Sequence, residues 1–340
     1  MGADIAIDLG TTRTRIYVQG AGVVIDEPTI VAVDIETDQI VAVGEEAYSM
    51  LGRVSKRIAV VYPLEGGAIS DFYLVEEIIS RFFRKVSSNK IVMPRAVACV
   101  PGDVTDVEKR AVVNSISAAG VRKVCLIDEP VAAAMGAGVD ISDAHGCIVA
   151  DIGGGTTDIA IISLGGIAVS KSIKVAGNKM DDDIIKYIRR TYSLHIGKRM
   201  AEDLKKAIGC VYPQPETTFY TIKGRDAVTG LPRMMDMTSE ELMDVLEDSA
   251  LQIVKQIQAV LEGTPPELAG DIFSDGIIIT GGLSQLRGFA ELIEKKTKLK
   301  VRVAQNPTNC VILGAGEAIK YIGALENKAF GVMNPLTSEY

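Results

Sequence analysis

The chain has 340 residues, of which 47% are hydrophobic, and a formal net charge of −8 at pH 7. A chain of this length and apolar content can bury a large core, so we expect two or more packed units and not a disordered segment. Because nucleic-acid binding needs a concentrated basic surface, the acidic balance without any basic block excludes nucleic acid as the main partner.

Redox and membrane signals point to the cytoplasm. The five cysteines are far apart and form no C-x-x-C pair, so we expect reduced thiols in the core. The chain enters a strand-like run almost at once, which predicts no signal peptide, and no apolar run of roughly 18 residues predicts a membrane span. With only His145 and His195, a zinc site is not expected, and any metal should be bound by oxygen.

A weak internal repeat is the first organised feature along the chain. Residues 5–18, IAIDLGTTRTRIYV, are echoed at 148–162 by IVADIGGGTTDIAII. In both copies an apolar run delivers an aspartate, then a Gly/Thr turn, then a second apolar run, which predicts two hairpins and therefore two related halves.

Alternating helical and strand patterns fill the rest of the chain. We expect helices at 71–86 and 104–119, a strand at 95–100, and a long helix that opens with a Thr238 to Glu241 capping box and stops at Gly263. A polar hairpin precedes that helix. A buried strand ending at Gly281 follows it, and then a helix over 286–297 and a final helix from about 314. This alternation predicts an α/β architecture.

The two Gly/Thr turns are candidate phosphate sites, because small residues let backbone N–H groups approach an anion. Each turn follows an aspartate, Asp8 or Asp151. Two carboxylates facing one polyphosphate would repel it unless Mg²⁺ lay between them, so we expect a magnesium–nucleotide complex. One such turn alone is more often a plain β-turn, and the second copy is what favours a function.

Six ordered motifs resemble the MreB family of bacterial actin homologues. They are DLGTTRTRIY, IDEPVAAAMGAG, DIGGGTTDIAIISLG, AEDLKKAIG, IIITGGLSQLRGF and PTNCVILGAGEAI, and the similarity extends from about residue 4 to about 322. The resemblance implies an actin-like ATPase fold with two α/β halves around a nucleotide cleft, each with a small subdomain. It implies subdomain IA at 1–32, 66–145 and 315–340, IB at 33–65, IIA at 146–178 and 248–314, and IIB at 179–247.

The resemblance also implies site residues and a function. Glu129 would orient the attacking water with Thr156 beside it, and Asp8 and Asp151 would hold Mg²⁺ through water. The nucleotide, ATP or possibly GTP, would be bound by Gly10, Thr11, Thr12, Arg13, Gly153, Gly154, Gly155, Thr156, Glu202, Asp203, Leu204, Lys205, Gly281, Gly282, Leu283, Ser284, Gln285 and Gly314. The implied activity is slow ATP hydrolysis coupled to assembly of a homopolymeric filament that determines cell shape with the cell-wall elongation machinery.

Three local patterns leave alternatives open. Arg13 stands where the family has Asn, and could reach the terminal phosphate or face solvent; Leu283 stands where the family has a third glycine. The three-residue spacing of Glu202 and Lys205 places both on one helix face, which fits a nucleotide contact or an exposed ion pair. A small-molecule kinase and a chaperone-type ATPase are the rival functions, although no large insertion suggests a substrate pocket and no peptide-binding domain is appended.

Membrane contact is the last expectation. The chain begins too close to its first strand for an N-terminal amphipathic helix, but residues 87–95 offer Ile91, Val92 and Met93 between Lys90 and Arg95. This loop could insert shallowly into the inner face of the cytoplasmic membrane, or simply lead into the next strand. The first alternative predicts a cytoplasmic, peripherally membrane-associated protein.

Overall fold

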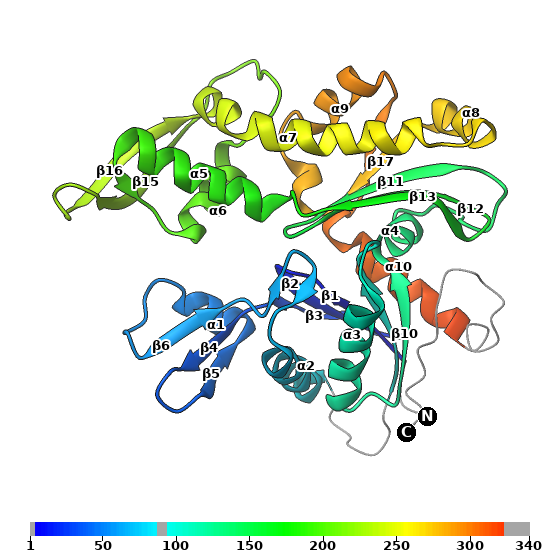
Figure 1. The fold of residues 1–340 in the computed structure, drawn as a ribbon, viewed down its shortest axis with the longest axis horizontal. Helices are drawn as coiled ribbons and strands as arrows, with labels where there is room; N and C mark the ends of the chain where they lie inside the picture. Colours follow the sequence, from blue (N-terminus) through cyan, green and yellow to red (C-terminus); the bar gives the residue numbers. More distant parts are fainter. Residues whose placement is uncertain (1–3, 87–93, 323–340) are drawn as a thin grey trace.

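The structure is a computed structural model that describes residues 4–86 and 94–322. The chain forms two α/β lobes that face one another (Figure 1). The lobes touch through backbone–carboxylate hydrogen bonds: Gly102 N donates to Asp158 Oδ1 at 3.0 Å, and Ser172 N donates to Asp103 Oδ2 at 3.0 Å. The two halves are therefore closed on each other.

A five-stranded mixed sheet forms the centre of the first lobe, in the order β10-β9-β1-β2-β3. Its strands are β1 (Ile5–Leu9), β2 (Arg13–Val18), β3 (Gly22–Pro28), β9 (Arg95–Val100) and β10 (Lys123–Asp128). β1 is buried at every position, as the middle strand of a covered sheet should be. The antiparallel register pairs Asp8 with Arg15 and Arg15 with Asp26, so these three charges lie in one row.

The second lobe repeats this topology, with sheet order β18-β17-β11-β12-β13. Its strands are β11 (Cys147–Ile152), β12 (Thr157–Ser163), β13 (Gly166–Ile173), β17 (Ile277–Thr280) and β18 (Val301–Val303). The equivalent strands β1 and β11 each lead through a Gly/Thr turn into an antiparallel partner. The expected pair of related halves and the α/β class are confirmed.

Two smaller sheets extend the lobes on the same side of the molecule (Figure 1). The first contains β4 (Val31–Asp34), β5 (Gln39–Val43) and β6 (Ile58–Val61) beside helix α1 (Gly44–Met50). The second contains β14 (Leu194–His195), β15 (Phe219–Asp226) and β16 (Pro232–Thr238) beside helices α5 (Gly177–Tyr192) and α6 (Lys198–Ile208). A short hairpin, β7 (Leu64–Glu65) and β8 (Ala68–Ile69), returns the chain to the first lobe.

Helices cover the large sheets and join the lobes. They are α2 (Phe72–Val86), α3 (Asp106–Ala118), α4 (Glu129–Gly136), α7 (Ser239–Glu262), α8 (Pro266–Asp275), α9 (Phe289–Thr297) and α10 (Cys310–Ala318), with 3-10 turns η1 (Gly282–Gln285), η2 (Pro307–Asn309) and η3 (Ile319–Tyr321). α4 and α10 lie side by side between the lobes (Figure 1). A Cβ on Gly314 would lie 1.8 Å from the carbonyl oxygen of Ala132, so only glycine permits this approach.

Three expected details differ in the structure. The final helix begins at Cys310 and not near 314, and the predicted helix at 286–297 begins only at Phe289. Thr238 Oγ1 accepts from Glu241 N at 3.2 Å, but the Glu241 carboxylate accepts from Tyr187 and Tyr192 instead of returning to the N-cap. The two half-buried phenols compete for this carboxylate, so only half of the capping box forms. All five cysteines are buried and free, as expected.

Candidate functional site

A cavity of about 540 Å³ opens between the two lobes. The turns that follow β1 and β11 line it from opposite sides, and the N-termini of α4 and α5, helix α6 and turn η1 complete its wall. A volume of this size lies in the range of small-molecule and cofactor sites. Most of the polar residues expected from the sequence to bind a nucleotide meet here.

The two Gly/Thr turns touch one another across the cavity. A Cβ on Gly154 would lie 1.7 Å from Thr12 Oγ1, and one on Gly155 would lie 2.3 Å from Thr11 Oγ1. Thr11 Oγ1 also accepts a 3.0 Å bond from Gly67 N in the β7–β8 hairpin. Because Gly154 and Gly155 have no side chains, the hydroxyls of Thr11 and Thr12 can approach the second turn closely.

The N-terminus of α5 fixes the second turn from behind. Gly177 N donates to Gly153 O at 3.1 Å, and Asn178 N donates to Gly154 O at 2.8 Å. The first two N–H groups of α5 are thus engaged by the turn, and Gly153 N donates to Thr156 O at 3.0 Å. The candidate donors to an anion are therefore the N–H groups of residues 154–156, close to the positive end of the helix.

Three buried carboxylates, Asp8, Glu129 and Asp151, face the same cavity. Burial raises the pKa of Glu129 well above its usual value and raises that of Asp8, and it raises the pKa of Asp151 to about 7. The neighbouring carboxylates add to the rise for Glu129. Thr280 Oγ1 donates to Asp151 Oδ1 at 2.6 Å and orients it.

This donor set fits Mg²⁺, which prefers carboxylate oxygens and keeps several of its waters. A cation between the two lobes would relieve the mutual repulsion that burial imposes on these acids. Within residues 4–86 and 94–322, no three or more His, Cys, Asp or Glu side chains are placed to hold a metal ion together. That Asp8 and Asp151 hold Mg²⁺ through water stays a prediction.

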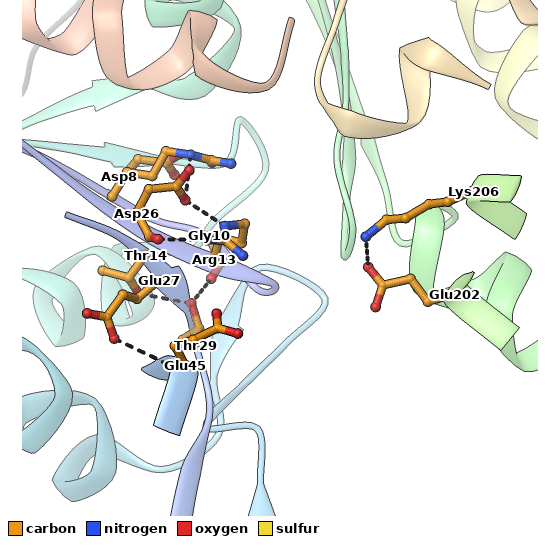
Figure 2. Close-up of polar contacts among 11 residues, drawn as sticks. Asp8, Gly10, Arg13, Thr14, Asp26, Glu27, Thr29, Glu45, Glu202 and Lys206 are labelled. Carbon is orange, nitrogen blue, oxygen red and sulfur yellow. Dashed lines mark hydrogen bonds and ion pairs between the residues drawn. The ribbon is translucent and has the colours of Figure 1, made fainter. Parts of the chain in front are cut away.

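Arg13 is held by Asp26 in the first lobe (Figure 2). Its Nε lies 2.6 Å from Asp26 Oδ1, and its Nη2 donates to Asp26 O at 2.6 Å. Arg13 also lines the cavity and its side chain is 37% exposed, so its reach to the terminal phosphate stays a prediction. In the strand register Asp26 lies opposite Arg15, and Arg13 reaches it diagonally from β2 to β3.

The backbone of the Gly10–Thr12 turn is held by Thr29, the residue that follows β3. Thr29 Oγ1 donates to Gly10 O at 2.7 Å and shares a 2.9 Å bond with Thr14 Oγ1 (Figure 2). Both hydroxyls are buried, so the backbone of the turn is fixed without help from a ligand.

Helix α6 presents its charges differently from the expected pairing. Glu202 pairs with Lys206 at 2.6 Å on the opposite side of the cavity from Asp8 (Figure 2). Lys205 is buried, and its Nζ donates to Gly177 O at 2.7 Å and lies 2.8 Å from Asp181 Oδ1. An exposed Glu202–Lys205 ion pair is therefore wrong, because the four-residue spacing aligns Glu202 with Lys206 while Lys205 braces the start of α5.

The glycine turn after β17 closes the other end of the cavity. Gly281 has φ +81°, and a Cβ there would lie 2.3 Å from the carbonyl oxygen of Ile152. Ser284 Oγ donates to Gly281 O at 2.7 Å and supports the turn from inside the protein. Gly282, Leu283 and Gln285 line the cavity, so Leu283 takes part in the wall where a third glycine was expected.

Four of the expected binding residues do not line the cavity: Asp203, Leu204, Ser284 and Gly314. Leu204 and Gly314 are buried in packing contacts, and Ser284 acts through its bond to the turn. The sequence reasoning missed other lining residues, chief among them Arg15, Asn178, Asp181, Lys206, Arg287 and Thr308. The Gly-Asn pair that opens α5 after a strand is the signal that could have revealed Asn178.

The residues of the expected membrane loop, Ile91, Val92 and Met93, lie outside the described residues.

A family model described as MreB/Mbl protein matches residues 2–327. The cell shape-determining protein Mbl of Bacillus cereus is 43% identical over 327 residues, which cover 96% of this chain and 98% of that protein. The chain belongs to the MreB/Mbl family. Its similarity to the cell shape-determining protein MreB of Escherichia coli K12 is 42% over 325 residues, which cover 94% of each. This match favours the MreB interpretation over the kinase and chaperone alternatives.

Solved structures agree with membership of the MreB/Mbl family. MreB5 of Spiroplasma citri bound to AMPPNP matches with a TM-score of 0.91 and 39% identity, over 96% of this chain and 99% of that one, and the same protein bound to ADP matches with a TM-score of 0.92. The MamK double helical filament matches with a TM-score of 0.80 at 22% identity, which supports the actin-like fold. Across residues 4–86 and 94–322, no helix is long and apolar enough to cross a membrane.

Proposed function

We propose that this protein binds ATP with Mg²⁺, polymerises into cytoskeletal filaments, and hydrolyses ATP slowly in a step coupled to assembly. It helps to determine cell shape, as the names of its curated relatives suggest, and it does so by organising cell-wall synthesis. The observation that carries the proposal is the meeting of two phosphate-type turns with Asp8, Glu129 and Asp151 in one cavity. The nucleotide-bound relative MreB5 supports it.

Binding is proposed to begin at the two turns. Peptide N–H groups of residues 10–12 and 154–156 donate to the phosphates, and the N-terminus of α5 adds its positive end. The cavity wall at α6 and η1, with Glu202, Lys206 and Gln285, takes the nucleoside end. ATP is the proposed nucleotide, and GTP is the alternative.

Hydrolysis is proposed to depend on positioning. Glu129 stands at the first residue of α4 and accepts a hydrogen bond from the attacking water, with Thr156 beside it. Burial and the neighbouring carboxylates raise the pKa of Glu129 well above its usual value. Mg²⁺, when bound, neutralises phosphate charge between the lobes. Asp8 and Asp151 would hold the Mg²⁺ ion through water molecules. Turnover is proposed to be slow until the chain assembles, because assembly would complete the positioning of these groups.

The cellular setting is proposed from the family resemblance. The partner is a second copy of the chain in a filament, and the cell-wall elongation machinery acts with it. The protein is cytoplasmic and associates peripherally with the inner face of the membrane, through the apolar residues Ile91, Val92 and Met93. We also propose the four subdomains with the bounds given above, although the 32/33 boundary falls inside β4 and the 314/315 boundary inside α10.

The experiment that tests this function compares assembly and hydrolysis in the same tubes. Purified protein is incubated with ATP, ADP or no nucleotide, and polymer is measured by sedimentation and electron microscopy while phosphate release is followed. Glu129→Ala should keep nucleotide binding and lose at least about tenfold in phosphate release, while Glu247→Ala, on the exposed face of α7, should keep both. Equal polymer yield in all three nucleotide states would reject the proposal.

Membrane association has its own test. Charging the loop with Val92→Glu and Met93→Glu should abolish co-sedimentation with liposomes, because each carboxylate opposes insertion into the bilayer interface. ATP binding should persist. Sedimentation that is unchanged in the double variant would place the membrane contact elsewhere.

A further inference from the structure

Two consecutive residues of the first lobe bind one cross-strand pair of the second lobe. Gly102 and Asp103 follow β9. Asp158 on β12 and Ser172 on β13 are partners in the antiparallel register. Gly102 N donates to Asp158 Oδ1 at 3.0 Å, and Ser172 N donates to Asp103 Oδ2 at 3.0 Å. We call this four-residue contact the corner clasp. Its two hydrogen bonds run in opposite directions, so each lobe supplies one backbone donor and one carboxylate.

Asp158 is a buried carboxylate that depends on the corner clasp. Only 1% of its surface is exposed. Burying a carboxylate costs free energy unless hydrogen-bond donors replace the lost water. Burial raises the pKa of Asp158, and the hydrogen bond from Gly102 N is the largest cause that opposes this rise. Opening the lobes would remove that donor, so the buried carboxylate favours the closed form.

The corner clasp lies next to the residues expected to position the attacking water. A Cβ on Gly67 would lie 2.9 Å from Pro101 Cγ and 2.9 Å from Thr156 Cγ2, so the chain just before the clasp and the second phosphate turn pack around the same glycine. The Thr156 hydroxyl also lowers the pKa of Asp158. After burial, the charge of Asp158 is the largest cause that raises the pKa of Glu129. Asp158 is therefore a neighbour of both groups, although it does not line the cavity.

We propose that Asp158 is a positioning residue for ATP hydrolysis. By accepting the hydrogen bond from Gly102, it closes the lobes beside the phosphate turns. The closed lobes then place Thr156 and Glu129 next to the attacking water. This inference rests on the proposed hydrolytic function. Because Asp158 lies outside the cavity lining, it acts through its neighbours and not on the nucleotide.

The first test measures kcat and KM for ATP from phosphate release, with polymer measured in the same tubes. Asp158→Ala should lower kcat by about tenfold and change KM by less than about twofold, because the lost contact aligns the reacting groups and does not touch ATP. Asp158→Asn keeps the oxygen that accepts from Gly102 N, so it should lose no more than about threefold in kcat. Asp244→Ala, at an exposed position of α7, is the matched control and should equal the wild type.

Hydrogen–deuterium exchange of the peptides that contain Gly102 gives a readout that is independent of activity. Exchange should be slow in the wild type and in Asp158→Asn, and about tenfold faster in Asp158→Ala, because only that variant lacks the acceptor. Folding of each variant is checked by its thermal unfolding midpoint. If Asp158→Ala does not fold, Asp103→Ala, at an exposed position, removes the other hydrogen bond of the clasp. It should then speed exchange at Ser172 and lower kcat without raising KM.

The outcomes separate the positioning role from the proposed function. If the wild type hydrolyses ATP and a folded Asp158→Ala variant keeps its kcat, the role of Asp158 is overturned and the nucleotide function stands. An Asp158→Asn variant as slow as Asp158→Ala would also overturn it, because the charge and not the hydrogen bond from Gly102 would then matter. A wild-type chain that releases no phosphate would overturn both the positioning role and the proposed hydrolysis.

Discussion

The phenol of Tyr48 donates a hydrogen bond of 3.1 Å to Glu202 Oε2 across the cleft. Tyr48 belongs to α1 and Glu202 to α6, so the bond joins the small sheet of one lobe to the small sheet of the other. Arg199 lies over the Tyr48 ring, 5.4 Å from its centroid, and Lys198 lies at the same distance over Tyr62. Glu202 is thereby fixed at the cavity wall by a residue of the opposite lobe.

Removing this hydroxyl should loosen the cleft. We expect Tyr48→Phe to raise the dissociation rate of ADP about fivefold, because one hydrogen bond to a charged group is lost only in the closed form. Stopped-flow fluorescence with a labelled ADP measures the rate. Tyr73→Phe, on the exposed start of α2, is the control and should match the wild type. Identical rates in all three proteins would mean that the contact does not hold the cleft closed.

The contact between the two turns predicts a strong effect at Gly154. In Gly154→Ala the added methyl would lie 1.7 Å from Thr12 Oγ1, so the turns must separate and their N–H groups lose the geometry for phosphate. We expect a loss of at least about tenfold in ATP affinity, measured by calorimetry. Gly197→Ala, where a Cβ would meet nothing within 4 Å, should bind normally. Normal binding by Gly154→Ala would show that the turns need not approach.

Two helical glycines should respond in opposite directions. Gly314→Ala places a methyl 1.8 Å from Ala132 O at the α4–α10 contact and should destabilise the protein by about 1–3 kcal/mol. Gly270→Ala, in α8 with open space around it, should stabilise by up to about 1 kcal/mol through helix propensity. Urea unfolding gives both values. A stabilised Gly314→Ala variant would contradict the close helix packing.

His145 predicts a pH-dependent contribution to stability. Its Nε2 lies 2.8 Å from Asp275 Oδ2 and its Nδ1 lies 3.3 Å from Asp271 Oδ1. The hydrogen bond to Asp275 raises the pKa of His145 above its usual value, and the charges of Asp271 and Asp143 add to this. A raised folded pKa means that stabilisation is complete below the unfolded value of about 6.5 and is lost as the pH rises through the folded pKa.

The measurement compares wild type with His145→Gln by urea unfolding at several pH values. The wild type should be the more stable protein at pH 6, and the difference should shrink towards pH 8 to 9 as the imidazole becomes neutral. His195→Gln, at the other histidine, is the control. A difference that is constant with pH would show that the interaction with the aspartates is not ionic.

Much of the site could be read from the chain because its signals are local. Asp8 and Asp151 follow apolar strands and precede Gly/Thr turns, and any chain that pairs such strands brings the turns to the strand ends. The repeat then predicts two copies facing one ligand. The start of α4 at Glu129 was predictable from a local signal too, because Pro130 follows it in the first helical turn.

The hydrogen-bond and ion-pair partners of side chains far apart in the sequence were not predictable, because they depend on strand register and on how the two lobes approach each other. The bond of Arg13 to Asp26, the place of Arg15 between two carboxylates, and the Tyr48–Glu202 contact join residues 13, 11 and 154 positions apart. Gly314 was expected at the nucleotide, but its missing side chain serves the contact between α4 and α10.

The sequence by itself determined the α/β class, the repeated turns and the acidic groups beside them, since these depend on hydrophobic period and on small residues close along the chain. Only the tertiary structure decided which cation meets which carboxylate, which glycine permits close packing, and which side chains line the cavity. Those choices depend on distances between segments that the chain brings together only when its core is buried.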